Sequence, residues 1–154
     1  MRTRTIILTV LLCFVAGAVC LADNPNMGTW KLNEAKSKIP AGAPKNATVV
    51  YEAAGDKIKV TVDGVDGEGK PAHNEWTGNF DGKDYPVTGD AASDTRSYKQ
   101  VNDHTLDLTT KKDGKVMASG KIVVSADGKT RTVTTEGKNA KGEKVKTMGV
   151  YDKQ

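Results

Sequence analysis

Large apolar side chains are scarce in this sequence, and the scarcity bears first on whether the chain folds at all. In the 132 residues that follow position 22, Val, Ile, Leu and Phe together number 20. This share, about 15%, is below the level at which disorder becomes the default expectation. However, the net charge is low, and the apolar residues recur at every second position rather than at random. We therefore expect an ordered β protein.

Cysteine is missing after position 20. Cys13 and Cys20 lie in an N-terminal stretch with a basic start at Arg2 and Arg4, an apolar run of ten residues and then small residues. This layout is typical of a secretory signal peptide, because the apolar run is too short to span a membrane. We expect residues 1–22 to be removed and the protein to be exported to the periplasm or the extracellular space.

Ala18 and Ala22 are both candidate cleavage sites, and the polar spacer after the apolar run favours Ala22. Cleavage there leaves residues 23–154 as a single domain without cysteine, which excludes disulfides and thiol catalysis. A lipid anchor at Cys20 is not expected, since Gly17 and Val19 depart from the residues that usually precede a lipidated cysteine. We expect no stable membrane insertion after cleavage, and a monomer.

Histidine is also scarce, and no catalytic or metal-binding arrangement can be assembled. His73 and His104 fall on different expected strands, without further ligands at metal-binding spacing, and both are expected to face solvent. No nucleophile elbow and no phosphate-binding glycine loop is present. Glu75 can be paired with Asp63 or Asp107, but all three lie on polar strand faces. We expect no enzyme activity, no metal and no cofactor.

Positive charge is in slight excess but is not concentrated. The formal net charge of +4 at pH 7 becomes +2 once Arg2 and Arg4 are removed. The lysines are spread over turns and strand edges, whereas a nucleic-acid-binding surface combines a basic stripe with stacking aromatics. Nucleic acid is therefore not an expected partner.

Short segments with alternating polarity follow one another along the chain, separated by turn residues every ten to twelve positions. This spacing is typical of an antiparallel barrel or sandwich. At most a short helical turn after Asn33 interrupts the pattern. We expect strands at Gly28–Leu32, Thr48–Ala53, Lys57–Val65, Ala72–Phe80, Tyr85–Val87, Thr95–Val101, His104–Thr110, Val116–Val124 and Thr130–Glu136, and a last strand ending at Tyr151.

Three Asp-Gly-Lys triplets begin at Asp81, Asp113 and Asp127. Asp-Gly pairs supply the positive φ angles of tight hairpins, so each triplet predicts a turn rather than a calcium loop. Pro86 indicates that its strand is short or lies at an edge. Gly120 interrupts a long alternating face and predicts a bend or bulge.

Aromatic residues are few, but five of them share the phase expected to face inward. They either fill the core or line a pocket for a small, partly apolar ligand, with Arg96 or Arg131 available to orient a polar group. The candidate ligand-binding residues are Tyr51, Trp76, Phe80, Tyr85, Tyr98 and Arg131. Trp30, near the end of the expected barrel, is expected to serve stability instead.

The opening Gly28-Thr29-Trp30 resembles the first strand of lipocalin-like, or calycin, barrels, which carries Gly-x-Trp. The segments that begin at Gly28, Phe80 and Ser125 are similar to small secreted bacterial proteins of unknown function with this architecture. The resemblance implies an up-and-down barrel of about eight to ten strands, either filled by side chains or holding one small ligand. An open β-sandwich is the alternative.

Lipocalins also pack an Arg or Lys near the last strand against the first-strand Trp. Here Arg96 and Arg131 lie earlier in the chain, so the resemblance leaves Lys144 or Lys146 for this role. We expect a protein that binds a small hydrophobic ligand inside the barrel. The alternative is a structural or interaction protein of the cell envelope or extracellular space, with a filled barrel.

Overall fold

The computed structural model describes residues 24–138 and 142–154, which form ten β-strands and one 3-10 turn. The 3-10 turn is η2 (Glu34–Lys36), with Asn33 as its N-cap, as the sequence predicted. The strands are β1 (Gly28–Leu32), β2 (Lys45–Ala54), β3 (Lys57–Val65), β4 (Pro71–Gly78), β5 (Tyr85–Thr88), β6 (Thr95–Asn102), β7 (Thr105–Lys112), β8 (Lys115–Val124), β9 (Thr130–Lys138) and β10 (Lys144–Lys153).

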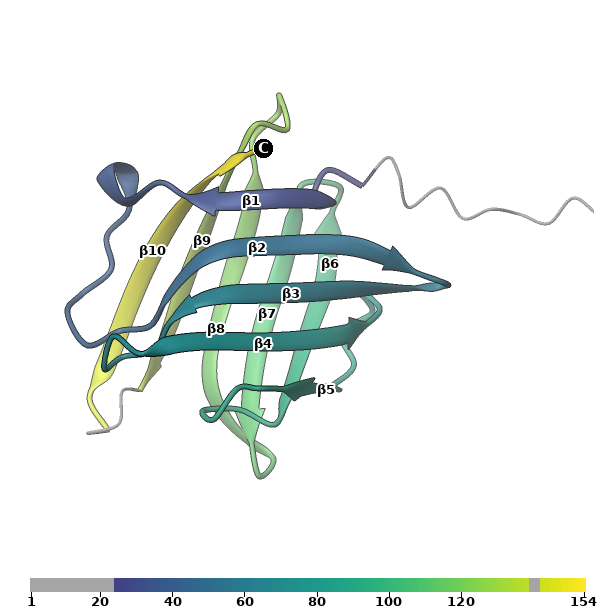
Figure 1. Cartoon of the computed structure of the whole chain (residues 1–154). Helices are drawn as coiled ribbons and strands as arrows, with labels where there is room; N and C mark the ends of the chain where they lie inside the picture. Colours follow the sequence, from purple (N-terminus) through teal and green to yellow (C-terminus); the bar gives the residue numbers. More distant parts are fainter. Residues whose placement is uncertain (1–23, 139–141) are drawn as a thin grey trace, which may run out of the picture.

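The strands close into one antiparallel barrel (Figure 1). Each strand pairs with its neighbours in sequence, and β1 closes the barrel by pairing with both β2 and β10. Trp30 accordingly lies opposite Val49 on one side and Lys153 on the other. The predicted barrel is confirmed, and the sandwich alternative is wrong, because every strand in the described part of the chain has a paired neighbour on both sides.

The strands are strongly tilted relative to the axis of the barrel. In Figure 1, β1 to β4 lie across the front, and β6 to β10 run steeply behind them. Right-handed strand twist and tilt are what allow a sheet of this size to close on itself. The strands β1 to β4 therefore cross β6 to β10 at a large angle, and side chains from both sets meet inside the barrel.

The predicted signal peptide, its cleavage site at Ala22 and both cysteines lie outside the described residues. Export and the absence of a lipid anchor at Cys20 remain predictions. Among the helical residues that the structure does describe, none form a segment long and apolar enough to cross a membrane.

The Asp113-Gly114 turn forms as predicted. It joins β7 to β8 through the pair Lys112 and Lys115, with φ angles of 49° at Asp113 and 74° at Gly114. Positive φ at both central positions matches the right-handed twist of the flanking strands, which is why this dipeptide is favoured there.

The Asp81-Gly82 segment is not the predicted tight hairpin. Residues 79–84 form a wide loop between β4 and β5, although Gly82 does adopt a φ of 79°. The backbone of this loop pairs with β6 instead. The N–H of Gly82 donates to the carbonyl of Tyr98 in β6, and the N–H of Gln100 in β6 donates to the carbonyl of Phe80. Strand β5 is short, as Pro86 predicted, and residues 80–82 extend the pairing beyond it.

Gly120 does not mark a bulge. Pairing continues in register through Leu108, Gly120 and Thr135, and the irregularity between β7 and β8 lies at Thr110 and Lys111 instead. A side chain at position 120 would collide with the backbone of β9 at Thr134. The residue is a glycine because two strands approach closely there, not because the ladder is interrupted.

Candidate functional site

The five aromatic residues predicted to face inward do lie together inside the barrel. Trp76 is at the centre of the cluster: its ring centroid is 4.8 Å from that of Tyr98, 5.7 Å from Tyr85 and 6.4 Å from Phe80. Tyr51 completes it, at 6.3 Å from Phe80 and 6.4 Å from Tyr98. Most of these contacts are edge-to-face, the arrangement that aromatic quadrupoles favour.

Two features fix the position of Trp76. Its indole N–H donates to the backbone carbonyl of Arg96 at 2.8 Å, which satisfies the polar end of a side chain that is 1% exposed. Gly78, two residues along the same face, leaves room for the Tyr85 ring, because a Cβ there would collide with Tyr85 and with Trp76 itself.

Phe80 and Tyr85 lie at the edge of the cluster and are only partly buried. The Tyr85 hydroxyl donates to the Asp81 carboxylate at 2.9 Å. The hydrogen bond from the Lys83 backbone lowers the pKa of Asp81, and the bond from Tyr85 adds to this effect. This edge is therefore held by the wide loop that joins β4 to β5.

The opposite wall of the barrel is built from small side chains. Residues directly opposite each other on paired strands point to the same face. Leu108 lies opposite the buried Tyr98, and the inner face continues from it across β8, β9 and β10. We call the following residues the small-residue wall: Thr110, Ala118, Gly120, Thr135, Gly137 and Thr147.

The small-residue wall remains partly exposed although it faces inward. Thr135 and Thr147, whose hydroxyls lie 2.7 Å apart, keep intermediate exposure, as do the larger neighbours Leu108 and Val133. At the Trp30 end, by contrast, Leu106, Ile122 and Val124 are buried. We infer that the barrel is packed at the Trp30 end and that solvent reaches its inner face along the small-residue wall.

Arg131 occupies the packed end. Its guanidinium carbon lies 5.0 Å from the ring centroids of Trp30 and Tyr51 and 4.8 Å from that of Tyr151. The Lys153 ammonium is 5.1 Å from the Trp30 ring. The basic partners of Trp30 are thus Arg131 and Lys153. The expectation for Lys144 or Lys146 is wrong, because both lie at the other end of β10, opposite Lys138 and Glu136.

The Arg131 guanidinium is incompletely paired. The residue is 2% exposed, and its Nε and Nη1 atoms are buried without a hydrogen-bond partner. Burial raises the pKa of the neighbouring Tyr151 hydroxyl to about 12, although the charge of Arg131 works in the opposite direction. For Tyr98, burial and the nearby Tyr51 raise the pKa, and Arg96 and Arg131 lower it in part.

Arg96, in contrast, has polar partners. Its Nη2 donates to the side-chain oxygen of Asn74 at 3.1 Å and lies 3.4 Å from the Asp90 carboxylate. Burial lowers the pKa of Arg96, but Tyr98 and Asp90 outweigh this effect and the net direction is upward. The buried Ser93 hydroxyl donates to Asp90 at 2.5 Å, so Asp90 links the loop after β5 to the barrel interior.

The structure therefore brings Tyr51, Trp76, Phe80, Tyr85 and Tyr98 into one cluster, and Arg131 joins it through Tyr51. Sequence reasoning did not assign Tyr151 or Asn74 to the interior. Tyr151 could have been found, because it shares the period-two phase of Thr147 and Gly149 in β10. Asn74 lies on the same face of β4 as Trp76, but the sequence alone does not show which side chain would form a hydrogen bond with a polar residue at that position.

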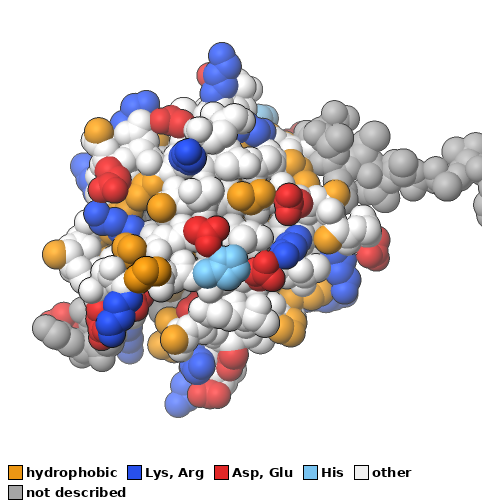
Figure 2. Space-filling view, viewed as in Figure 1, with side chains coloured by type: hydrophobic (Ala, Val, Ile, Leu, Met, Phe, Trp, Pro, Cys, Tyr) orange, Lys and Arg blue, Asp and Glu red, His pale blue; other side chains and the backbone are white. Residues whose placement is uncertain are grey.

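The outer face carries a separate polar group on β3 and β4. His73 Nδ1 lies 2.6 Å from the Asp63 carboxylate, and Lys59 Nζ lies 2.7 Å from Glu75, which lowers the pKa of Glu75. On the face viewed in Figure 2, histidine (pale blue) and acidic (red) side chains gather together on the surface. The prediction of a solvent-exposed His73 is confirmed. His104, which was also expected to face solvent, is instead partly buried, and its Nδ1 is buried without a partner.

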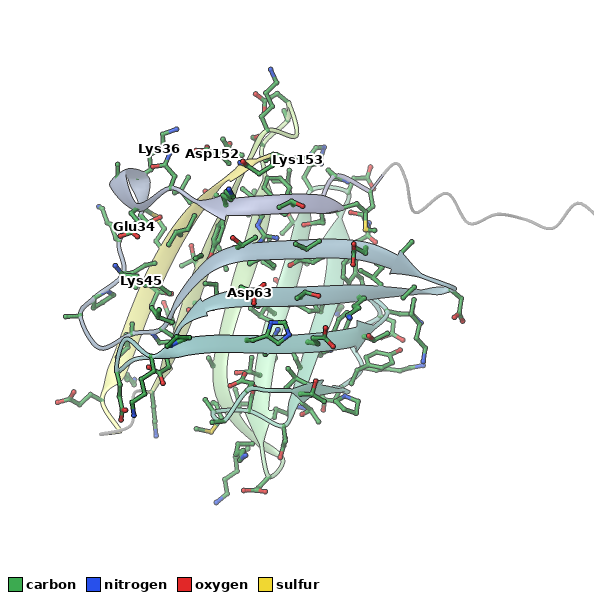
Figure 3. The ribbon with its side chains drawn as sticks, viewed as in Figure 1. Glu34, Lys36, Lys45, Asp63, Asp152 and Lys153 are labelled. Carbon is green, nitrogen blue, oxygen red and sulfur yellow. The ribbon has the colours of Figure 1, made fainter. Side chains whose placement is uncertain are left out.

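A pocket of about 150 Å³ lies outside the barrel, beside η2, and is lined by Glu34, Ser37, Ile39 and Lys45. Figure 3 shows Glu34 and Lys45 pointing toward each other, and their charged groups are 3.1 Å apart. Because these two charged groups pair with each other, the pocket offers a ligand few unpaired charged or polar groups. Within residues 24–138 and 142–154, no group of three His, Cys, Asp or Glu side chains is placed to hold a metal ion.

Comparisons with known proteins add little to this geometry. No family model matches the sequence, and no curated protein matches it. Among solved structures, the chain is similar to a redesigned beta barrel, mFAP1, bound to DFHBI. The two share 16% identity with a TM-score of 0.48, over 86% of this chain and 98% of that one.

Proposed function

We propose that this protein binds a small, partly apolar molecule inside the barrel, between the aromatic cluster and the small-residue wall. The observation that carries the proposal is the contrast between the two walls. One wall is aromatic and buried around Trp76, and the other is formed by inward-facing Gly, Ala and Thr that stay partly exposed. A barrel filled by its own side chains would bury both walls.

The asymmetry suits a ligand with a flat or extended apolar body. Trp76 and Tyr98 are already buried by the protein, so the aromatic surface open to a ligand belongs to the partly exposed rings of Phe80 and Tyr85, which have little conformational freedom to lose. The hydroxyls of Thr135 and Thr147 bond each other, which leaves one O–H free to donate to solvent or to a ligand. Removal of apolar surface from water would then supply most of the binding free energy.

The test uses N-phenyl-1-naphthylamine, an uncharged apolar probe whose emission rises in an apolar environment. We expect saturable binding to the folded protein, with quenching of tryptophan emission, and loss of the response in Trp76→Ala provided that circular dichroism shows an intact fold. Since Trp30 and Trp76 are the two tryptophans of the chain, the quenching can be assigned.

A matched pair on β9 controls for folding. Thr135 faces the interior and Thr134, its neighbour in the strand, faces outward. Thr135→Leu narrows the space along the small-residue wall and should weaken probe binding, whereas Thr134→Leu adds the same side chain outside and should not. Equal effects of the two substitutions would contradict a site inside the barrel.

The alternative is a filled-barrel protein that acts through its outer face. Met117 and Val123, which are 36% and 43% exposed on β8, give this alternative its support. It predicts that folded protein shows no saturable response to the apolar probe. That result would overturn ligand binding and direct attention to the outer face of β8.

The proposal places the protein outside the cytoplasm, as the sequence of residues 1–22 predicts. Intact-mass measurement of protein isolated from its own host tests this part separately. A chain that begins at Asp23 without added acyl groups agrees with it. A chain that begins at Cys20 with added acyl mass would mean export with a lipid anchor, and a chain that keeps residues 1–22 contradicts export.

A further inference from the structure

Two neighbouring hairpins, β7–β8 and β9–β10, each end in two lysines that lie directly opposite each other. Lys112 pairs with Lys115 across the Asp113-Gly114 turn, and Lys138 at the end of β9 pairs with Lys144 at the start of β10. We call these four residues the turn lysines. Like charges in directly opposite positions destabilise a strand pair, so the stability of the fold does not explain them.

The turn lysines also lack the carboxylate partners of their neighbours. Lys111 is 2.6 Å from Asp84, and Lys146 is 2.8 Å from Glu136. Within residues 24–138 and 142–154, no carboxylate forms an ion pair with a turn lysine. The acidic side chain in the β7–β8 turn is Asp113, and positive charge is in excess at this end of the barrel.

Apolar side chains accompany this charge. Val116 and Met117 directly follow the β7–β8 turn and are 60% and 36% exposed. Lys111 pairs with Val116 and Thr110 pairs with Ala118, so Met117 is the extra residue of a bulge. Adjacent residues of a regular strand point to opposite faces, and the bulge interrupts this alternation. Two neighbouring apolar side chains thus remain in water next to the turn lysines.

The β7–β8 hairpin protrudes from the barrel. Its turn extends below the other strands in Figure 1, and the ends of β9 and β10 reach the same lower side. The two hairpins are in contact, because Ala118 pairs with Gly137 and a Cβ at Gly137 would lie 2.8 Å from the carbonyl oxygen of Met117. Turn lysines therefore lie on both sides of the apolar tip that Val116 and Met117 form.

We propose that this tip docks reversibly on the surface of an anionic phospholipid bilayer. The turn lysines attract the negative headgroups, and Val116 and Met117 enter the boundary between headgroups and acyl chains. A basic surface alone fits any polyanion, and an apolar tip alone fits any apolar partner. Their combination on a protruding hairpin fits the bilayer interface, which offers both environments within a few ångströms. This inference goes beyond ligand binding and does not depend on it.

Co-sedimentation with vesicles provides the first test. It uses the chain from Asp23 onward, which contains every strand of the barrel, because the apolar run in residues 1–22 would bind lipid by itself. One set of vesicles mixes phosphatidylcholine with phosphatidylglycerol, and the other is phosphatidylcholine alone. Each lysine near an anionic surface strengthens binding about fivefold, so we expect at least about tenfold stronger binding to the anionic vesicles, weakened by added salt. Equal binding to both, or no binding to either, overturns the inference.

A charge-matched pair of variants locates the electrostatic contribution. Lys112→Gln combined with Lys115→Gln should weaken binding to the anionic vesicles at least about tenfold. Lys121→Gln combined with Lys129→Gln removes the same charge from the outer face of β8 and from the β8–β9 turn, where both side chains are exposed. These positions are away from the docked tip, so binding should fall by less than about threefold. Equal losses would mean that net charge alone attracts the protein, which contradicts docking through this hairpin.

A second pair of variants tests the apolar contribution. Val116→Ser combined with Met117→Ser should weaken binding at least about fivefold, because less apolar surface leaves water on docking. Val101→Ser combined with Val123→Ser also removes two exposed apolar side chains, at 50% and 43% exposure, but from outside the tip. This control should bind as the wild type does. All four positions are exposed, so both variants should fold, and circular dichroism verifies this. Equal effects of the two pairs overturn the inference.

A fluorescent label reports directly on whether the tip enters the bilayer. The chain from Asp23 onward has no cysteine, so Met117→Cys and Val123→Cys each supply a single site for a nitrobenzoxadiazole label. The emission of this label rises and shifts to shorter wavelength in apolar surroundings. We expect this change with anionic vesicles for the label at position 117 and not for the label at position 123. Vesicle-bound protein whose label at position 117 stays in water, or responds no more than the label at position 123, contradicts the proposed docking.

Discussion

Arg131 and Tyr151 lie directly opposite each other on neighbouring strands, with the guanidinium carbon 4.8 Å from the centre of the tyrosine ring. Together with Trp30, they pack the end of the barrel at which β1 joins β10. Tyrosine and arginine thus replace the aliphatic side chains in which this sequence is poor. Because the polar atoms of these side chains are buried as well, the stability of the packed end depends on their protonation state.

The first prediction concerns stability at high pH. Burial raises the pKa of Tyr151 from 10.0 to about 12 in the folded protein. Both states keep the phenol protonated below pH 10, so its contribution is fully present there. Between pH of about 10 and 12 the unfolded chain loses this proton first, and the free energy of unfolding should fall by roughly 2–3 kcal/mol.

Denaturant unfolding at several pH values measures this loss. Lysine deprotonation also occurs in this range, so the comparison with Tyr151→Phe isolates the phenol. In that variant the decline between pH 10 and 12 should be shallower than in the wild type. Parallel curves for the two proteins would contradict a buried, protonated Tyr151.

The second prediction separates the two tryptophans. Trp30 is fully buried, and its indole N–H donates to the carbonyl of Asn26 at 2.8 Å. Trp30→Ala leaves a cavity at the packed end and should lower the free energy of unfolding by about 3–5 kcal/mol. Val116→Ala, at a side chain that is 60% exposed, serves as the control and should change it by less than about 0.5 kcal/mol. A Trp30→Ala protein as stable as this control would contradict the packing.

Much of the fold was predictable because each strand buries one face. The alternation of Ile58, Val60 and Val62 determines both the bounds of β3 and the side that faces the core. The same phase placed Trp76 and Tyr98 inside, and they do meet there. Period-two patterns and turn residues are local signals, so they predicted the strands and an antiparallel barrel or sandwich. The resemblance of Gly28-Thr29-Trp30 to the first strand of lipocalin-like proteins favoured the barrel.

The partners of individual side chains were not predictable, since they depend on barrel closure. Arg131 packs on Trp30 from the other end of the chain, across β10. The sequence also did not show that residues 80–82 would pair with β6 rather than form a tight hairpin. That choice depends on how far apart β4 and β6 lie in the closed barrel, which no local pattern contains.

The third prediction concerns the loop after β5. Asp90 lies 3.4 Å from the buried Arg96 guanidinium and accepts a hydrogen bond from Ser93. Asp90→Asn keeps the shape of the side chain but removes the charge that balances Arg96, so the free energy of unfolding should fall by about 1–3 kcal/mol.

The matched control for this change is Asp107→Asn. Asp107 lies 3.4 Å from Lys121 on the exposed outer face, so the same change of charge should have little effect on stability. Equal stability losses in the two variants would mean that Asp90 contributes no more than a surface ion pair.

The fourth prediction reverses the usual effect of a substitution. Replacing a glycine inside a strand by alanine normally stabilises the folded state, since glycine loses more conformational entropy on folding. At Gly120, however, a Cβ would collide with the backbone at Thr134 and with the Thr135 side chain. Gly120→Ala should therefore lower the free energy of unfolding by about 1–3 kcal/mol, because β8 and β9 must move apart. Ser119→Ala, on the outer face of the same strand, should have little effect, and a Gly120→Ala protein more stable than wild type would show that the two strands are not in close contact.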